Sequence, residues 1–177
     1  TEQQQACMFW ENSTDAFCVY EDSNDINTTF MLRMFNYTNL SFSGEINISF
    51  DLPPNGNSTS LDSFILKQRP NYFGNMTAMT ANNEGGVNDS ILFVVFNKTS
   101  NDVGGIKPIF NWSSPANFTL VGDLEDSGNN VDGAWIVNGS QFCMIAGNGN
   151  YSAFAHPTNL SMFCYDTSIN NITNNMP

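Results

Sequence analysis

Residues 40–52 alternate strictly between apolar or glycine positions and polar positions. The even positions are Leu40, Phe42, Gly44, Ile46, Ile48, Phe50 and Leu52, and every odd position is polar or charged. A period of two over this length predicts a β-strand with one face in a core and the other in water. Asn39 and Asn47 have the parity of the face in water.

Further short segments rich in apolar, aromatic and β-branched residues are separated by clusters of Gly, Asn and Pro. This pattern predicts strands at residues 28–35, 63–67, 72–79, 90–96, 106–110, 118–121, 134–137, 141–146, 151–155 and 161–165. Many short strands with turn signals between them indicate an all-β fold. We expect an antiparallel β-sandwich, Ig-like or jelly-roll-like, with no amphipathic helix and no internal repeat.

Residues 91–96 (Ile-Leu-Phe-Val-Val-Phe) are apolar at every position. Both faces of such a strand avoid water, so we expect a central strand covered by the opposing sheet on one side. A loop, a ligand or a partner would cover the other side.

The chain has 177 residues, enough for one domain with a real core. Residues 26–166 would form the β-sandwich. Residues 1–25, with Cys7 and Cys18, would be a segment stapled to the core or a strand exchanged between subunits. Residues 167–177 would be a polar tail or a linking strand.

Acidic residues outnumber basic ones by 17 to 5, which gives a net charge of −12. Binding to nucleic acid requires Lys and Arg to neutralise phosphates, so this balance argues against it. The sequence contains no apolar run long enough to span a membrane.

N-glycosylation sequons, Asn-X-Ser/Thr with X not Pro, are the most abundant motif. The chain has 27 Asn, and 30 of its 177 residues are Ser or Thr, so chance alone would give about five sequons. The sequence contains 15, at Asn12, Asn27, Asn36, Asn39, Asn47, Asn57, Asn75, Asn88, Asn97, Asn111, Asn117, Asn138, Asn150, Asn159 and Asn171. This excess predicts a heavily N-glycosylated protein at the cell surface or outside the cell.

Four cysteines, Cys7, Cys18, Cys143 and Cys164, fit two disulfides in an oxidising compartment. We favour Cys7 with Cys18 and Cys143 with Cys164, because each pair closes a short loop. A pairing that ties the N-terminus to the C-terminal strands is the alternative. Neither pair has the CxxC spacing of redox or zinc sites.

Catalytic and metal-binding patterns are sparse. His156 is the only histidine, and the sequence lacks a GxSxG nucleophile motif. The acidic loop of residues 122–133 offers Asp123, Asp126 and Asp132 as oxygen ligands for a structural calcium ion. We therefore expect no enzyme and no cofactor, with calcium as an alternative.

The segment Gly85-Gly86-Val87-Asn88-Asp89-Ser90, continuing through the apolar run to Phe96, resembles the middle of DOMON-type domains. These are secreted β-sandwiches that bind haem b or sugars. The resemblance covers about a third of the chain and implies an iron held by a methionine and a late histidine. Val87 stands where that methionine would be, so Met79 or Met76 would take its place, with His156 as the histidine.

Two functions follow from these patterns. The first is a non-catalytic structural or adhesive glycoprotein, a subunit of a surface coat or filament that self-associates into a homopolymer or layer. The alternative is a DOMON-like module for haem b electron transfer or sugar binding.

Overall fold

The computed structural model describes residues 5–9, 15–24, 27–47, 60–70, 76–84, 90–100, 105–114, 131–136, 139–148 and 159–176. These residues form β-strands and the turns that join some of them. None of the described segments is a helix long and apolar enough to cross a membrane.

The strands run in chain order as follows: β1 (Gln5–Phe9), β2 (Asp15–Asn24), β3 (Asn27–Asn36), β4 (Ser41–Asn47), β5 (Ser60–Gln68), β6 (Met76–Glu84), β7 (Ser90–Lys98), β8 (Ile106–Ser113), β9 (Val131–Ile136), β10 (Gln141–Asn148), β11 (Asn159–Asp166) and β12 (Asn171–Met176).

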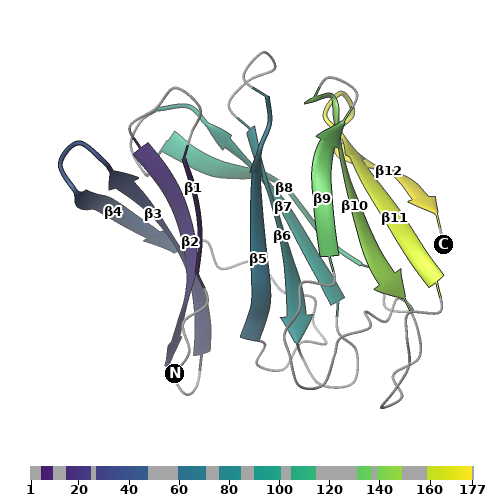
Figure 1. Ribbon diagram of the computed structural model, residues 1–177, viewed down its shortest axis with the longest axis horizontal. Coiled ribbons are helices and arrows are strands. Elements are labelled where there is room, and N and C mark those ends of the chain that lie inside the picture. The colour runs from purple at the N-terminus through teal and green to yellow at the C-terminus, as the bar shows by residue number, and fades with distance from the viewer. Residues whose placement is uncertain are drawn as a thin grey trace.

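The strands form three antiparallel sheets of four, β1–β4, β5–β8 and β9–β12. Within each sheet every strand pairs with the next strand in the chain, so each sheet is a simple meander. The sheets lie in a row along the longest axis, with β5–β8 in the middle (Figure 1).

The three sheets repeat one detail of their pairing. In each sheet the register between the third and the fourth strand shifts at a bulge. The extra residue lies on the fourth strand in all three cases: Gly44 in β4, Ile109 in β8 and Thr173 in β12. A bulge sharpens the local twist of a strand pair. The three sheets therefore share their strand order and the position of this bulge.

A shared core joins the middle sheet to the third sheet. Ile91, Phe93 and Val95 of β7 pack in one buried cluster with residues of β9, β10 and β11. The ring of Phe93 stacks on Phe142 at a centroid distance of 5.4 Å and lies 5.7 Å from the ring of Tyr165. Large rings bury much apolar surface, so this cluster holds the two sheets together.

The β7 side chains on the opposite face of the middle sheet are also buried. Leu92, Val94 and Phe96 alternate with the residues of the first cluster and are also buried. Figure 1 places the β1–β4 sheet on this side, and Leu32 and Met34 of β3 are also buried. Side chains on both faces of β7 are thus buried.

The sheets converge at their first strands. Between different sheets, Cα atoms repeatedly approach within 8 Å at β1 and β5, β2 and β5, β5 and β9, and β6 and β9. Packed sheets usually lie about 10 Å apart. Small residues, Ala78 and Gly133, lie on the converging strands of the second interface, whereas Phe110 and Trp112 of β8 contact Tyr165 and Phe163. The space between neighbouring sheets is therefore wedge-shaped, and it is narrowest near β1, β5 and β9.

The expectation of an all-β, antiparallel fold is confirmed. Its strands form three sheets, however, where we expected the two of a sandwich. Residues 1–25 contribute β1 and β2, which pair with each other and with β3 of the same sheet. Residues 167–177 contain the turn after β11 and then β12, which pairs with β11.

The face assignment at residues 40–52 is wrong at two positions. Leu40 lies in the turn before β4 with φ 49° and is 72% exposed, and Phe42 is 54% exposed. The bulge at Gly44 (φ 55°) is the reason, because its extra residue moves Phe42 to the same face as Glu45. Residues 48–52 lie outside the described part.

Most other predicted strands are confirmed. Those at residues 28–35, 63–67, 90–96, 106–110, 141–146 and 161–165 lie within strands of the structure. The segments at residues 72–79 and 134–137 overlap β6 and β9 in part. The segments at residues 118–121 and 151–155 fall outside the described residues.

Replacing Gly133 with alanine should destabilise the fold. A Cβ atom there would lie 2.6 Å from two ring atoms of Phe142 and 3.0 Å from the carbonyl oxygen of Cys143. Phe142 is buried, so overpacking should cost about 1–3 kcal/mol in the free energy of unfolding. Denaturant unfolding measures this cost. The matched control Ala134→Ser, at the exposed next position, should change it by less than about 0.5 kcal/mol. Equal stability of the two variants would contradict the close packing at Gly133.

Candidate functional site

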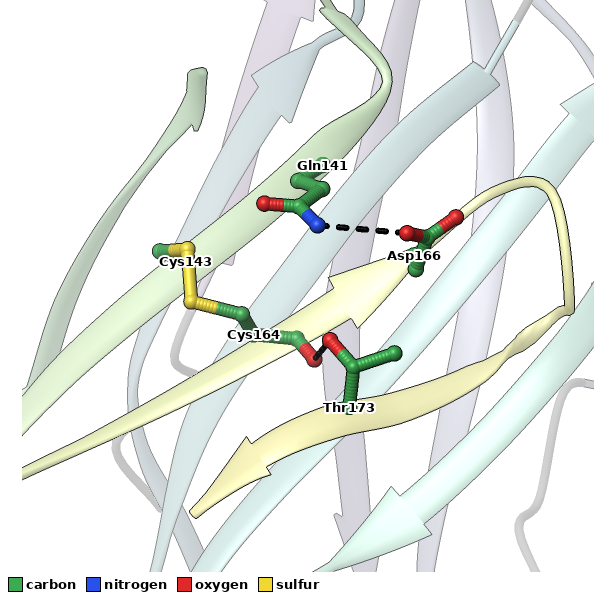
Figure 2. Close-up of a disulfide and its surroundings, with 5 residues drawn as sticks. All are labelled: Gln141, Cys143, Cys164, Asp166 and Thr173. Carbon is green, nitrogen blue, oxygen red and sulfur yellow. Dashed lines mark hydrogen bonds between the residues drawn. A yellow bond between two sulfur atoms is a disulfide. The ribbon is translucent and has the colours of Figure 1, made fainter. Parts of the chain in front are cut away.

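A disulfide joins Cys143 of β10 to Cys164 of β11 (Figure 2). The two residues are directly opposite in the strand register, and their Cα atoms are 4.1 Å apart. That spacing is close to the separation of a non-hydrogen-bonded antiparallel pair, the position from which two side chains can meet. The predicted pairing of these two cysteines is confirmed.

Cys18 is also disulfide-bonded. Its position opposite Cys7 in the β1–β2 register supports the local pairing predicted for them. Each of the two cysteine pairs therefore faces its partner across a hairpin, β1–β2 in the first sheet and β10–β11 in the third.

The Cys143–Cys164 bridge lies on the side of the third sheet that faces away from the middle sheet. Exposed or half-exposed apolar side chains share this side, and we call Ala134, Ile136, Ile145, Leu160 and Met162 the C-terminal face. Ile136 is 40%, Ile145 50% and Leu160 66% exposed. Such a group of aliphatic side chains around a disulfide is a candidate surface for binding another apolar surface.

A second exposed surface lies on the far side of the first sheet. We call Tyr20, Arg33, Phe35, Phe42 and Glu45 the N-terminal face. Nε and Nη2 of Arg33 donate to the Glu45 carboxylate at 2.9 and 2.6 Å. The Arg33 guanidinium also lies 4.8 Å from the Tyr20 ring centroid and 5.5 Å from that of Phe42. The exposed ion pair adds about 0–1 kcal/mol of stability, so its main effect is to orient Arg33 among the rings.

A polar network borders the C-terminal face at the start of the β11–β12 turn. Nε2 of Gln141 donates to Oδ2 of Asp166 at 3.1 Å (Figure 2). The backbone N–H and the hydroxyl of Ser168 donate to Oδ1 of Asp166 at 2.8 and 2.6 Å. The hydrogen bonds from Ser168, followed by the one from Gln141, hold the pKa of Asp166 below its usual value.

Arg69 joins the middle sheet to the third sheet just after β5. Its Nε donates to the carbonyl oxygen of Gly139, and its guanidinium lies 5.8 Å from the Trp135 ring centroid. Nε1 of Trp135 donates to the carbonyl oxygen of Lys67 at 2.9 Å. Burial of Arg69 lowers the pKa of its guanidinium. Sequence reasoning did not single out Arg69, because a lone arginine in a sequence carries no signal of its partners.

The sequon asparagines in the described part are Asn27, Asn36, Asn39, Asn47, Asn97, Asn111, Asn159 and Asn171. Asn39, Asn111 and Asn171 are exposed, and Asn36 and Asn97 are half-buried. All eight lie on the third or fourth strand of their sheet or in the turn between them. The remaining seven, at Asn12, Asn57, Asn75, Asn88, Asn117, Asn138 and Asn150, lie outside the described residues.

The candidate ligands for haem and calcium are not brought together by the described residues. Met79 is fully buried in β6, in the middle of the fold, and Met76 packs against the core. Asp132 of β9 is exposed and lies 3.9 Å from Nζ of Lys67. His156, Asp123 and Asp126 lie outside the described part. Within that part, His, Cys, Asp and Glu side chains form no group of three or more that could hold a metal ion.

Comparisons with known proteins assign no family to this chain. No protein-family model, no curated protein and no solved structure matches it.

One signal in the sequence could have identified the two related hairpins. Gln5-Ala6-Cys7-Met8 at β1 and Gln141-Phe142-Cys143-Met144 at β10 share the pattern Gln-x-Cys-Met. The partner cysteines also follow a phenylalanine in both cases, as Phe17-Cys18 and Phe163-Cys164. The two copies of this pattern are far apart along the chain, which is why comparing neighbouring segments does not detect it.

Replacing Asp166 with asparagine should flatten the loss of stability in acid. The folded-state pKa of Asp166 is depressed below the ordinary value of 3.8. Its carboxylate therefore stabilises the fold above that value, and the contribution is lost as the pH falls through the lower folded-state pKa. Denaturant unfolding between about pH 2 and pH 7 measures this slope. Ser168→Ala, which removes one donor, should give an intermediate slope. Parallel curves for all three proteins would contradict the role of this network.

Proposed function

We propose that the protein is a non-catalytic, extracellular structural or adhesive glycoprotein, a self-associating subunit of a surface coat or filament. We also propose that neighbouring sheets of the chain pack face to face, as in a β-sandwich.

The position of the sequons is the observation that carries the proposal. The first and second strands of the three sheets are together almost as long as the third and fourth strands. The first two strands nevertheless contain no sequon asparagine, whereas the third and fourth strands and the turn between them hold all eight described ones. N-glycans are bulky and must lie on the surface. Within the described strands, this distribution supports selection for a glycan coat, since accidental sequons would fall on every strand.

Glycans on the fourth strands would also protect exposed sheet edges. Asn47, Asn111 and Asn171 lie on β4, β8 and β12, which are edge strands. Unpaired edges invite uncontrolled pairing with other chains, and bulky groups prevent it. The disulfides add support for an oxidising, extracellular compartment, because cytosolic proteins rarely keep them.

The alternative, a DOMON-like module for haem or sugar, stays a prediction with no observation of its own in favour. The middle sheet that would hold Met79 is covered on both faces by sheets of the same chain. A Soret band in the absorption spectrum of the purified protein would favour this alternative over the structural role.

Intact mass before and after enzymatic deglycosylation tests the proposal. Protein secreted from a glycosylating eukaryotic host should carry N-glycans, and peptide mapping should find Asn39, Asn111 and Asn171 occupied, because these side chains are exposed. The deglycosylated protein should also be four hydrogens lighter than the same deglycosylated protein after reduction, because all four cysteines are bonded. A secreted protein without glycans would contradict the proposal.

A further inference from the structure

We propose that the protein assembles head to tail, with the N-terminal face of one copy stacked on the C-terminal face of a second copy. This inference rests on the proposed function and adds the partner and the two surfaces to it.

The fold itself supplies the mode of contact. The middle sheet is covered on each face by a four-stranded meander with the same fourth-strand bulge. The outer sides of the first and third sheets are where this stacking stops within the chain (Figure 1). A second copy offers the same kind of sheet, so stacking across copies continues an arrangement that already occurs within one chain.

Both end faces carry apolar side chains that such a contact would bury. Phe42 on one face and Ile136, Ile145 and Leu160 on the other are exposed to solvent. On the N-terminal face, the centroids of the Phe35 and Phe42 rings lie 5.1 Å apart, with the two rings tilted by 59°. Aromatic and branched aliphatic side chains pack well against each other between sheets.

Charge disfavours the pairing of two C-terminal faces. The N-terminal face carries Arg33, one of only five basic residues in the chain. The C-terminal face is bordered by Asp132 and Asp166. Two C-terminal faces would bring these carboxylates together, whereas the N-terminal face adds no net charge opposite them, because Arg33 is paired with Glu45 of the same face. Charges at a rim set orientation and partner choice more than affinity.

The described sequons leave the centre of both faces open. In the first sheet, Asn27 begins β3, Asn36 ends it, Asn39 lies in the turn and Asn47 ends β4. In the third sheet, Asn159 begins β11 and Asn171 begins β12. Glycans at these positions would ring the border of each face. The same coat that blocks edge pairing therefore permits stacking.

The size of the contact sets the concentration at which it should form. Four strands of about seven residues make a flat face of about 19 Å by 23 Å. If the faces are treated as flat, two of them bury roughly 900 Å² in total, which is near the lower limit for a specific interface. The protruding side chains would add to this area. Association should therefore be of micromolar strength, and the wedge of the sheets would curve the stack into a ring or a helical filament.

Sedimentation velocity of the full, glycosylated chain at about 1–200 µM tests the proposal. The wild-type protein should form species of twice the monomer mass or larger. Phe42→Asp and Ile145→Asp should each weaken association about tenfold or more, because each buries an unpaired charge. An equimolar mixture of the two variants should form a dimer, since each retains the face that the other lacks.

Two further variants complete the experiment. Ile169→Asp changes another exposed isoleucine, in the β11–β12 turn outside both faces, and should not affect association. Leu160→Asp repeats the test on the C-terminal face if Ile145→Asp does not match the wild-type circular dichroism. Association lost in Ile145→Asp but unchanged in Phe42→Asp would overturn head-to-tail stacking in favour of paired C-terminal faces. Association unaffected by either variant would overturn this inference alone, and a wild-type monomer at every concentration would overturn the proposed function with it.

Discussion

The burial of β7 on both faces is the constraint on which the rest of the structure depends. Six consecutive apolar side chains, from Ile91 to Phe96, cannot lie in a sheet with one wet face. The third sheet packs against Phe93 and its neighbours, and the first sheet lies on the other side of the middle sheet (Figure 1). Each outer sheet then has one face toward the middle sheet and one outward face.

Sequence patterns predicted the strands well and their faces less well. Strand existence depends on local composition, which is why the strands around residues 28–35, 90–96 and 161–165 were confirmed. The face of a residue depends on uninterrupted alternation, and a single bulge residue such as Gly44 reverses it. The alternation of apolar and polar residues continues through Gly44 without a break, so it could not show on which face Phe42 lies.

The common arrangement of the three sheets has no counterpart in the sequence. The sheets share a meander order and a fourth-strand bulge, which depend on backbone geometry and not on shared residues. The hairpins at Cys7 and Cys143 share the pattern Gln-x-Cys-Met, but they are β1–β2 and β10–β11 and so take different places in their sheets. The pairing of each cysteine with its local partner was predictable from chain distance, whereas the two end faces required the strand register to be known.

The structure separates two kinds of surface on one chain. The described sequons lie on the third and fourth strands and the turn between them, and the end faces carry rings, aliphatic side chains and cross-strand cysteines. On the proposed function, glycans at the sequons would keep neighbours away, and the end faces would pack against a second sheet. A subunit of a repeating extracellular assembly needs both, which is why the fold and the proposed role fit together.

The most direct test of this account compares Val94→Ala with Val95→Ala by denaturant unfolding. The two valines are consecutive, identical and fully buried, and they point to opposite faces of the middle sheet. If both faces are covered by sheets of the chain, each variant should lose about 2 kcal/mol in the free energy of unfolding. A loss confined to Val95→Ala, with Val94→Ala within about 0.5 kcal/mol of wild type, would contradict the three-layer structure.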